Sequence, residues 1–265
     1  MKLTLIITTY NWPEALLLVL NSVKRQKIFP EEIIIADDGS NDTTKDLIIS
    51  YKKNCDIKII HSWQEDLGFR ASRSRNNAIK KASGDYIVLI DGDTILHPNF
   101  VKDHIKSAEP GFFVQGSRAL LSENQTIIAL NEGKVNFSFL TPKLKNWKNS
   151  IYSKLLSSLF SNKNTHLRSI KSCNMAFYTK DCLKVNGFNN EFEGWGREDS
   201  EFVVRLINRG VKRKNVRFKA IQFHLWHNEN SRNSLQKNDA MLNDAINNQI
   251  YWCENGISSL ENNES

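Results

Sequence analysis

The segment Tyr86-Ile87-Val88-Leu89-Ile90-Asp91-Gly92-Asp93 joins an apolar run of five residues to two carboxylates that flank a glycine. Such a short apolar run, bounded by turn residues, predicts a buried β-strand over residues 86–90. Glycine allows the backbone to turn directly after the strand, so both carboxylates can face the same side. Paired carboxylates often bind Mg²⁺ or Mn²⁺, although Asp-Gly is also frequent in surface turns. The strand favours the metal site, because it places the pair at the edge of a sheet.

Three more expected strands precede this segment, and helices alternate with them. The expected strands cover residues 3–8, 32–36 and 57–61. The expected helices cover residues 13–26, 42–51 and 71–82. The strands are apolar runs rich in β-branched residues, and the helices have apolar residues at helical spacing. Strands that alternate with helices are joined by right-handed crossovers, which give a mostly parallel sheet with helices on both faces. The sequence therefore predicts an α/β fold.

Polar clusters follow the first, second and fourth of these strands. They are Thr8-Thr9-Tyr10-Asn11, Asp37-Asp38-Gly39-Ser40 and Asp91-Gly92-Asp93. Because parallel sheets bind ligands at the carboxyl ends of their strands, we expect the three clusters to converge on one crevice. A carboxylate of the second cluster can accept a hydrogen bond from a base or a ribose, although this cluster also fits a turn that caps the next helix.

The pattern is less regular beyond about residue 110. Strands are expected over residues 112–117, 175–178 and 218–225. Helices are expected over residues 198–208 and 234–252. A further set of apolar residues recurs every three or four positions with lysines between them, and it predicts a basic amphipathic helix. This set is Leu144, Trp147, Ile151, Leu155 and Leu159.

Positive charge is concentrated in this part of the chain. The formal net charge is +7, yet residues 133–180 hold nine basic residues and no acidic one, and the remaining chain holds 27 basic and 29 acidic residues. A chain that is neutral outside one segment does not resemble a basic nucleic-acid binder, so we expect no nucleic-acid partner. Residues 143–171 fit two environments: an anionic membrane surface with the apolar face down, or a core-packed helix with a lysine-rich solvent face.

The composition is that of a globular protein, with 40% hydrophobic and 25% charged residues in a chain of 265. No run of about 18 apolar residues occurs, so no membrane-spanning helix is expected. The first residues turn polar too soon for a signal peptide, and the four cysteines form no Cys-x-x-Cys motif, which favours a reducing cytoplasm. We expect the chain to divide into two halves, residues 1–110 and residues 111–253. The second half would contain a basic insertion at about 133–171, and a flexible tail would follow at 254–265.

The segment Gly194-Trp195-Gly196-Arg197-Glu198-Asp199 places two acids at the start of an expected helix. Acids at that position stabilise a helix N-terminus whatever their other role. A purely structural role does not require a tryptophan between two glycines. The segment therefore favours a general base held beside an indole that can stack on a sugar ring.

Histidines and arginines supply two further candidates. His224 and His227 follow the last expected strand and could complete a metal site begun by Asp93, although a histidine at a strand end is usually structural. Three arginines precede or begin the third helix and suit a diphosphate, although a solvated helix face is the more common fate of such a run. They are Arg70, Arg73 and Arg75.

Taken together, these motifs resemble the family 2 glycosyltransferases, which have the GT-A fold. The resemblance to the nucleotide-sugar half rests on the three polar clusters with Gly68-Phe69-Arg70 and Arg75-Asn76-Asn77-Ala78, over residues 3–105. Residues 172–230 resemble the acceptor half of chondroitin-polymerase-type and β-1,4-galactosyltransferase-type enzymes, through Asn186-Gly187-Phe188, the Gly194–Asp199 segment and His224-Leu225-Trp226-His227. The ordered set is specific, although each motif alone is weak. The resemblance implies a Rossmann-like nucleotide-binding half with a mostly parallel sheet and a smaller acceptor-binding half.

The resemblance also implies roles for residues of the donor half. Tyr10 and Asp38 would hold the uracil, with Thr8 nearby, and Arg75 would face the diphosphate. Asp91 would lie by the ribose and the metal.

The metal itself would be bound by Asp93 and by His224, with His227 as the alternative ligand. The implied cofactor is Mn²⁺ or Mg²⁺.

In the acceptor half, Asp199 would be the catalytic base, and Glu198 would position the acceptor. Trp195 would line the acceptor or the donor sugar. Related transferases often carry glycine where Arg197 stands, so this cation would contact an acidic acceptor or pair with a surface acid.

The implied activity is an inverting, metal-dependent transfer of a hexose or N-acetylhexosamine from a UDP-sugar to a hydroxyl group. The acceptor would be a surface glycan or a glycolipid of the lipopolysaccharide or capsule type, and the enzyme would lie in the cytoplasm or on the inner face of the plasma membrane. The alternatives are a sugar nucleotidyltransferase and a non-catalytic sugar- or nucleic-acid-binding protein.

Overall fold

Strand β1 (Leu3–Thr9) lies inside an eight-stranded sheet in the computed structural model, which describes residues 1–228 and 231–260. The strand order is β3-β2-β1-β4-β9-β6-β10-β8. The other strands are β2 (Glu32–Asp37), β3 (Lys58–Trp63), β4 (Tyr86–Asp91), β6 (Phe112–Gln115), β8 (Asn162–Asn164), β9 (Asn174–Tyr178) and β10 (Lys212–Asn215). Strands β1 to β4 are parallel, whereas β9 is antiparallel to both β4 and β6. The expected α/β fold is confirmed.

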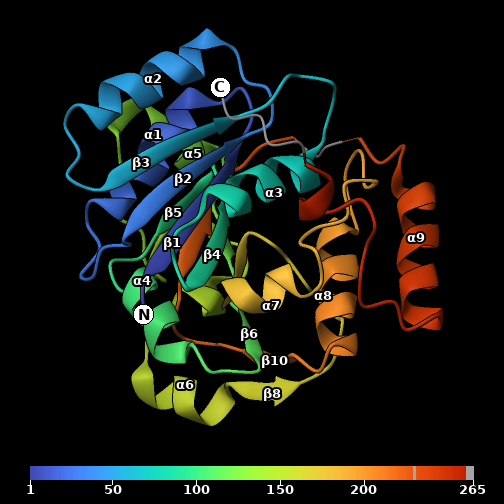
Figure 1. Cartoon of the computed structure of the whole chain (residues 1–265). Coiled ribbons are helices and arrows are strands. Elements are labelled where there is room, and N and C mark those ends of the chain that lie inside the picture. The colour runs from blue at the N-terminus through green and yellow to red at the C-terminus, as the bar shows by residue number, and fades with distance from the viewer. Residues whose placement is uncertain (229–230, 261–265) are drawn as a thin grey trace.

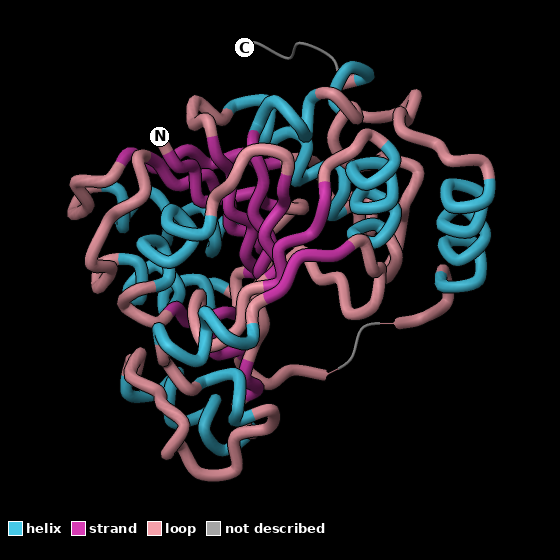
Figure 2. The backbone as a smooth tube through the Cα atoms, turned by 90° about the horizontal axis from the view of Figure 1, so that it is seen from below, coloured by secondary structure: helices cyan, strands magenta, loops and turns pink. Residues whose placement is uncertain are grey.

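Helices cover both faces of this sheet (Figure 1). One face packs against α1 (Pro13–Val23), α2 (Asp42–Lys52) and α4 (Phe100–Ser107). The other face packs against α3 (Ala71–Lys81), α7 (Thr179–Leu183) and α8 (Glu198–Asn208). Figure 2 shows the strands running through the middle of the molecule between these two layers.

The sequence of β4 explains why both faces are covered. Tyr86, Val88 and Ile90 point into the core below α1, while Ile87 and Leu89 point into the core below α3 and α8. All five side chains are at most 1% exposed. A parallel strand buried on both faces needs a continuous apolar run rather than an alternating one, and this is the pattern of residues 86–90.

A second, three-stranded sheet lies beside the main one. It contains β5 (Thr94–Leu96), β11 (Gln222–His224) and β7 (Ala119–Leu120), in that order. The helix α5 (Glu123–Glu132) packs Ala129 into the apolar core on this sheet. Pairing of β5 with β11 brings residues 94–96 and 222–224 together, although more than 120 positions separate them in the chain.

Helix α9 (Leu235–Asn247) packs along α8 at the side of the molecule (Figure 1). None of the helices in the described ranges has the length and apolar character that crossing a bilayer requires. Strands from both sides of residue 110 share the main sheet, and the division into halves at this position stays a prediction.

The expected basic helix over Leu144 to Leu159 is wrong. The segment forms a short 3₁₀ helix η1 (Trp147–Ser150), an extended stretch, and α6 (Lys154–Phe160). Asn146 adopts a left-handed φ of 56°, and the Ser153 side chain caps α6 by accepting from the Leu156 N–H. These two residues interrupt the helix despite the apolar spacing, because spacing records which residues could share a face and not whether the backbone is continuous.

Three other boundaries differ from expectation. The strand expected over 218–225 shrinks to β11 because Phe218 and Ala220 have positive φ, and the helix expected over 234–252 ends at Asn247. In the tail expected to be flexible from residue 254, the part up to Leu260 contacts the rest of the protein: η2 (Ile257–Ser259) packs Ile257 into the core, and the Ser258 N–H donates to Asn186. Residues 261–265 of that tail lie outside the described residues.

Candidate active site

The carboxyl ends of β1, β2 and β4 lie side by side, as expected from the three polar clusters. Thr8 is in register with Asp91, and Thr9 with Asp37. The Gly92 N–H donates to the Thr8 carbonyl at 2.7 Å. A Cβ at Gly92 would lie 3.0 Å from this oxygen, so glycine permits the close approach of the turn to β1.

Asp93, His224 and His227 form the one group of metal-binding type found among residues 1–228 and 231–260. The Nε2 atoms of both imidazoles lie 3.3 Å from Asp93 Oδ2, and the ligand atoms of all three side chains lie within 4.8 Å of one another. Asp93 is held there because the Leu225 N–H donates to its carbonyl, at the end of the β5–β11 pair. The structure thus brings both alternative histidines to Asp93.

The chemistry of this group fits a divalent ion. Asp93 Oδ1 is buried and has no hydrogen-bond partner, so the carboxylate keeps a free acceptor. Burial lowers the pKa of His224, which favours the neutral imidazole that binds metals. Burial alone would raise the pKa of Asp93, but the two imidazoles outweigh it and hold this pKa below its ordinary value. One carboxylate with two imidazoles is a ligand set suited to a divalent first-row transition ion.

Asp91 lies beside this group, and Arg75 connects it to Glu198. Burial and the neighbouring charge of Asp93 raise the pKa of Asp91 to about 6, while Arg75 opposes the rise. Arg75 Nη2 lies 4.0 Å from Asp91 Oδ1, and Arg75 Nη1 donates to Glu198 at 3.1 Å. Arg75 itself is buried against the ring of Phe188, at 5.4 Å from the ring centre.

Asp199 lies beside Glu198 in the first turn of α8. Its carboxylate accepts from Ser200 Oγ at 3.1 Å and from the Ser172 N–H at 3.3 Å. Burial, followed by the charge of Glu198, raises the pKa of Asp199 to about 7, although Arg75 opposes the shift. A carboxylate with a pKa near neutrality can accept a proton from a substrate and later release it, as a general base requires.

The expected uracil residues lie at the ends of β1 and β2. Asp38 is buried and accepts from Gln64 at 2.6 Å and from the Arg70 N–H at 2.8 Å, and burial raises its pKa to about 6. Tyr10 is half exposed, and its hydroxyl donates a hydrogen bond to the Asp66 carboxylate at 2.9 Å. Thr8 Oγ1 is buried without a hydrogen-bond partner, so it can accept or donate to a ligand.

The three arginines of the sequence analysis have different environments. Only Arg75 points into the group of carboxylates. Arg70 contributes its backbone N–H to Asp38, while its side chain donates to the Glu65 carbonyl. Arg73 is exposed on α3. The diphosphate interpretation is thus supported geometrically for Arg75 alone.

Trp195 and Arg197 precede α8 in a strained turn. Trp195 is 41% exposed between Gly194 and Gly196, which both have positive φ, and the Arg232 guanidinium lies 5.5 Å from its ring. Arg197 has a φ of 76° and pairs with Asp239 of α9, so of its two expected roles the structure shows the pair with a surface acid. A left-handed backbone is more easily adopted by glycine than by arginine, so Arg197 holds this turn at a conformational cost.

Arg118 is a candidate that the sequence did not reveal. It follows β6, in a region without periodicity, and its guanidinium lies 3.5 Å from the buried Cys173 sulfur. Its charge lowers the pKa of both Asp91 and Asp93, and its Nε is buried without a partner. No local pattern marks this arginine, because its approach to the carboxylates depends on the pairing of β6 with β9.

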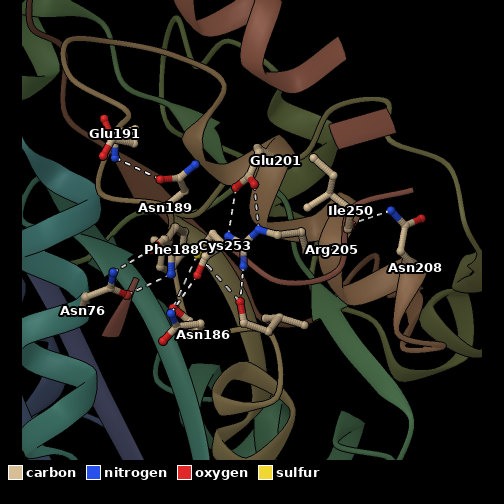
Figure 3. A network of polar contacts seen from close by, with 11 residues as sticks. Asn76, Asn186, Phe188, Asn189, Glu191, Glu201, Arg205, Asn208, Ile250 and Cys253 are labelled. Carbon is tan, nitrogen blue, oxygen red and sulfur yellow. Dashed lines mark hydrogen bonds and ion pairs between the residues drawn. The ribbon is translucent and has the colours of Figure 1, made fainter. Parts of the chain in front are cut away.

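A buried polar network fixes the loop that faces Arg75 (Figure 3). Asn76 of α3 donates to the Phe188 carbonyl and accepts from the Phe188 N–H, at 2.6 and 2.8 Å. Arg205 of α8 is fully buried and binds both carboxylate oxygens of Glu201, at 2.6 and 2.9 Å, and the Val185 carbonyl. Residues 185–188 therefore connect α3, which carries Arg75, to α8, which carries Asp199.

Comparisons with known proteins identify the family of this chain. The model of "Glycosyl transferase family 2" matches residues 4–180, and that of "N-terminal domain of galactosyltransferase" matches residues 156–228. The hyaluronan synthase of Pasteurella multocida is 29% identical over 234 residues, which cover 78% of this chain and 23% of the synthase. The chondroitin synthase of Escherichia coli is 27% identical over 237 residues, which cover 81% of this chain and 33% of that enzyme. This chain thus spans about a quarter to a third of these relatives.

Solved structures share the fold. S. aureus TarS 1–349 in complex with UDP superposes with a TM-score of 0.62 at 17% identity, covering 91% of this chain and 64% of that one. The mannosyltransferase PcManGT from Pyrobaculum calidifontis, in complex with GDP-Man and Mn²⁺, superposes with a TM-score of 0.57 at 16% identity. The superposition covers 84% of this chain and 56% of PcManGT. Both likenesses concern the fold, which is the GT-A fold. Because the family model matches about two thirds of the chain, the protein belongs to glycosyl transferase family 2 and is a glycosyltransferase.

Proposed function

We propose that this glycosyltransferase moves a hexose or N-acetylhexosamine from a UDP-sugar to an acceptor hydroxyl, with inversion and with the help of a divalent ion. The observation that carries the proposal is the continuity of the site. Asp91 interacts electrostatically both with Asp93, in the metal-binding group, and with Glu198, beside Asp199. Arg75 contacts both Asp91 and Glu198, so the residues proposed for the metal, the diphosphate and the proton transfer form one connected group.

A UDP donor is supported by two observations. Thr8, Tyr10 and Asp38 lie together at the strand ends where nucleotides bind in this type of sheet. The neighbouring TarS structures contain UDP or UDP-GlcNAc, although PcManGT contains GDP-Man.

The metal would be held by Asp93, His224 and His227. When bound, it would neutralise negative charge that develops on the departing diphosphate. Two arginines of this chain act on the same charge. Arg75 is fixed between Asp91 and Glu198, and Arg118 offers an unpartnered N–H. Fixed cations that face developing charge accelerate the step rather than merely bind the substrate.

Asp199 performs the proton transfer. As the acceptor oxygen forms its bond to the anomeric carbon, Asp199 takes the hydroxyl proton, and the bond from that carbon to the diphosphate oxygen breaks with its electron pair leaving on UDP. A single displacement from the opposite face inverts the anomeric carbon. Glu198 positions the acceptor, and Trp195 offers an exposed indole face on which a sugar ring can stack.

The acceptor that we propose is a glycan or glycolipid of the lipopolysaccharide or capsule type, used in the cytoplasm or at the inner face of the plasma membrane. The relatives are named as hyaluronan and chondroitin synthases, whose products are polysaccharides. A membrane contact through residues 143–171 would bring the enzyme to a lipid-linked acceptor.

A panel of nucleotide sugars tests the proposal. Wild-type protein with Mn²⁺ should transfer from, or slowly hydrolyse, one or a few UDP-sugars. Asp199→Asn should abolish transfer, by at least 10²-fold, while leaving UDP binding largely intact in calorimetry. Equal turnover of purified, metal-loaded Asp199→Asn and wild type would remove the base assignment. Turnover of GDP-sugars alone would remove the UDP assignment.

A further inference from the structure

An open pocket of about 470 Å³ lies between α4, α6 and β10, away from the catalytic residues. Four lysines line it, together with serine side chains that include Ser158 and Ser161. The four lysines are Lys106, Lys163, Lys214 and Lys219, and the pocket that they line is called the lysine pocket below. The pocket is at the β8 end of the sheet, four strand spacings from β4, which is roughly 19 Å at the usual spacing.

The lysine pocket keeps an excess of positive charge. Glu109 pairs with Lys163 at 2.6 Å and with Lys214 at 3.0 Å, which fixes these two ammonium groups. Among the described residues, neither Lys106 nor Lys219 forms a salt bridge. Asp103 does interact with Lys219 electrostatically, but its carboxylate is already bound to the Ala220 N–H and to the Tyr152 hydroxyl. The ammonium groups of Lys106 and Lys219 are donors suited to a phosphate.

Apolar side chains flank the lysine pocket on α6. Leu155, Leu159 and Phe160 are 70%, 68% and 52% exposed, and they are called the apolar ridge below. Leu155 and Leu159 are one helical turn apart and share a face. A cluster of large exposed apolar side chains marks an interaction site rather than ordinary surface. In Figure 1, α6 and β8 form the lower end of the molecule, with no helix below them.

The basic and aromatic character continues beyond the ridge. The Phe160 ring lies 5.8 Å from that of Phe218, and the Arg217 guanidinium lies 5.7 Å from the latter. Arg217 also lines a shallow groove with Trp147 and Lys148. Tryptophan, lysine and arginine at the border of an apolar patch are typical of a membrane–water interface, where the charged heads reach the lipid headgroups.

We propose that this face binds an anionic bilayer, with the lysine pocket holding a lipid phosphate and the apolar ridge inserted among the acyl chains. The inference rests on the proposed function only in its choice of a membrane as the place where the acceptor is found. A soluble acidic glycan would use the lysines but leave the leucines in water. A symmetric second copy would bring the two lysine pockets toward each other, with like charges opposed.

Flotation with vesicles tests this surface. Wild-type protein should bind vesicles of phosphatidylcholine with phosphatidylglycerol and should bind vesicles of phosphatidylcholine alone much more weakly. Lys106→Ala with Lys219→Ala should weaken binding to the anionic vesicles roughly 30-fold, since each near-surface lysine contributes about 1 kcal/mol. The matched control, Lys45→Ala with Lys52→Ala on the exposed side of α2, removes the same charge and should change binding little.

The ridge needs its own comparison. Leu155→Ser with Leu159→Ser should reduce vesicle binding at least about tenfold, whereas Ile49→Ser with Ile127→Ser, at exposed apolar positions elsewhere, should not. Asp199→Asn should bind vesicles like wild type, and the pocket and ridge variants should retain turnover with a soluble acceptor, so failure of the membrane contact is distinguishable from failure of the transferase proposal.

Three results would overturn the proposal. The first is equal binding to both kinds of vesicle, and the second is an equal loss in the pocket variant and its matched control. The third is the absence of vesicle binding in a protein that binds hyaluronan or inorganic phosphate through the same lysines, or that forms a dimer broken by the ridge variant.

Discussion

The guanidinium of Arg75 lies 3.1 Å from the Glu198 carboxylate and 4.0 Å from that of Asp91, so one buried cation joins the two sides of the site. Burial would lower the pKa of Arg75, but the two carboxylates outweigh it and keep the side chain charged. Glu198 also lies next to Asp199 in the chain, and its electrostatic interaction contributes to the raised pKa of Asp199.

Glu198→Gln should shift the pH profile of the enzyme to lower pH. Asp199 must be unprotonated to act as a base, so wild-type kcat/KM should fall as the pH drops below the Asp199 pKa of about 7. Removal of the Glu198 charge stabilises the Asp199 carboxylate and lowers its pKa, so the fall should occur at lower pH in the variant. Profiles of kcat/KM against pH for the two proteins measure the shift.

The size of kcat is not the readout here, because Glu198 also has a proposed role in acceptor positioning. Glu191→Gln, at an exposed acid outside the first turn of α8, is the control and should leave the profile in place. An acid limb that stays at the same pH in Glu198→Gln would show that another group controls it.

Replacement of any of the three proposed metal ligands should weaken Mn²⁺ binding. Asp93→Ala should abolish Mn²⁺-dependent UDP binding, and His224→Ala and His227→Ala should each lower the Mn²⁺ affinity by at least about tenfold, since changes even to outer-shell groups cost 10–100-fold. Calorimetric titration of Mn²⁺ in the presence of UDP measures this. The control His166→Ala removes an exposed histidine outside the group. Unchanged UDP affinity with and without Mn²⁺ in wild type would contradict a metal-assisted site.

Arg118→Met should reduce kcat/KM by about 10²-fold, which is the usual cost of removing one donor that faces developing charge. Arg118→Lys should restore part of the rate, because it restores the charge without the fork of N–H groups. Arg73→Met, at an exposed arginine of α3, is the matched control. Melting temperatures recorded alongside separate a catalytic loss from misfolding. A fully active Arg118→Met would place this arginine outside the diphosphate site.

The buried pair below the site should be costly to break. Arg205→Met leaves the Glu201 carboxylate buried and unpaired and removes the donor to Val185, so the free energy of unfolding should fall by about 3–5 kcal/mol. Replacement of both partners, as Glu201→Leu with Arg205→Met, should cost less than the single change, because no charge is then left uncompensated. Urea unfolding of the three proteins measures both. A double variant less stable than the single one would show that the uncompensated Glu201 carboxylate is not the main cost of Arg205→Met.

Periodicity in the sequence predicted the elements that have strong local signals. The first four strands and three helices, and α8, lie within a few residues of their expected bounds. The weaker elements were not predicted: α5 buries only Thr126 and Ala129, so its pattern is faint, and β7 has two residues. Burial of residues 86–90 on both faces was encoded locally, since a continuous apolar run leaves no solvent face.

The residues of the candidate site also differ in how far the sequence predicted their placement. The positions of Asp91, Asp38 and Thr8 at the carboxyl ends of parallel strands could be predicted from the sequence alone, because strand identity and the direction of the crossovers are local and chiral properties. The order of these strands in the sheet came from the structure. Four features became visible with the folded chain: both histidines reach Asp93, Arg118 interacts with the carboxylates, Arg197 pairs with Asp239, and the basic segment breaks into η1 and α6. These contacts join residues brought close by strand pairing and helix packing, and the energy that selects them depends on the assembled core rather than on any neighbour in the sequence.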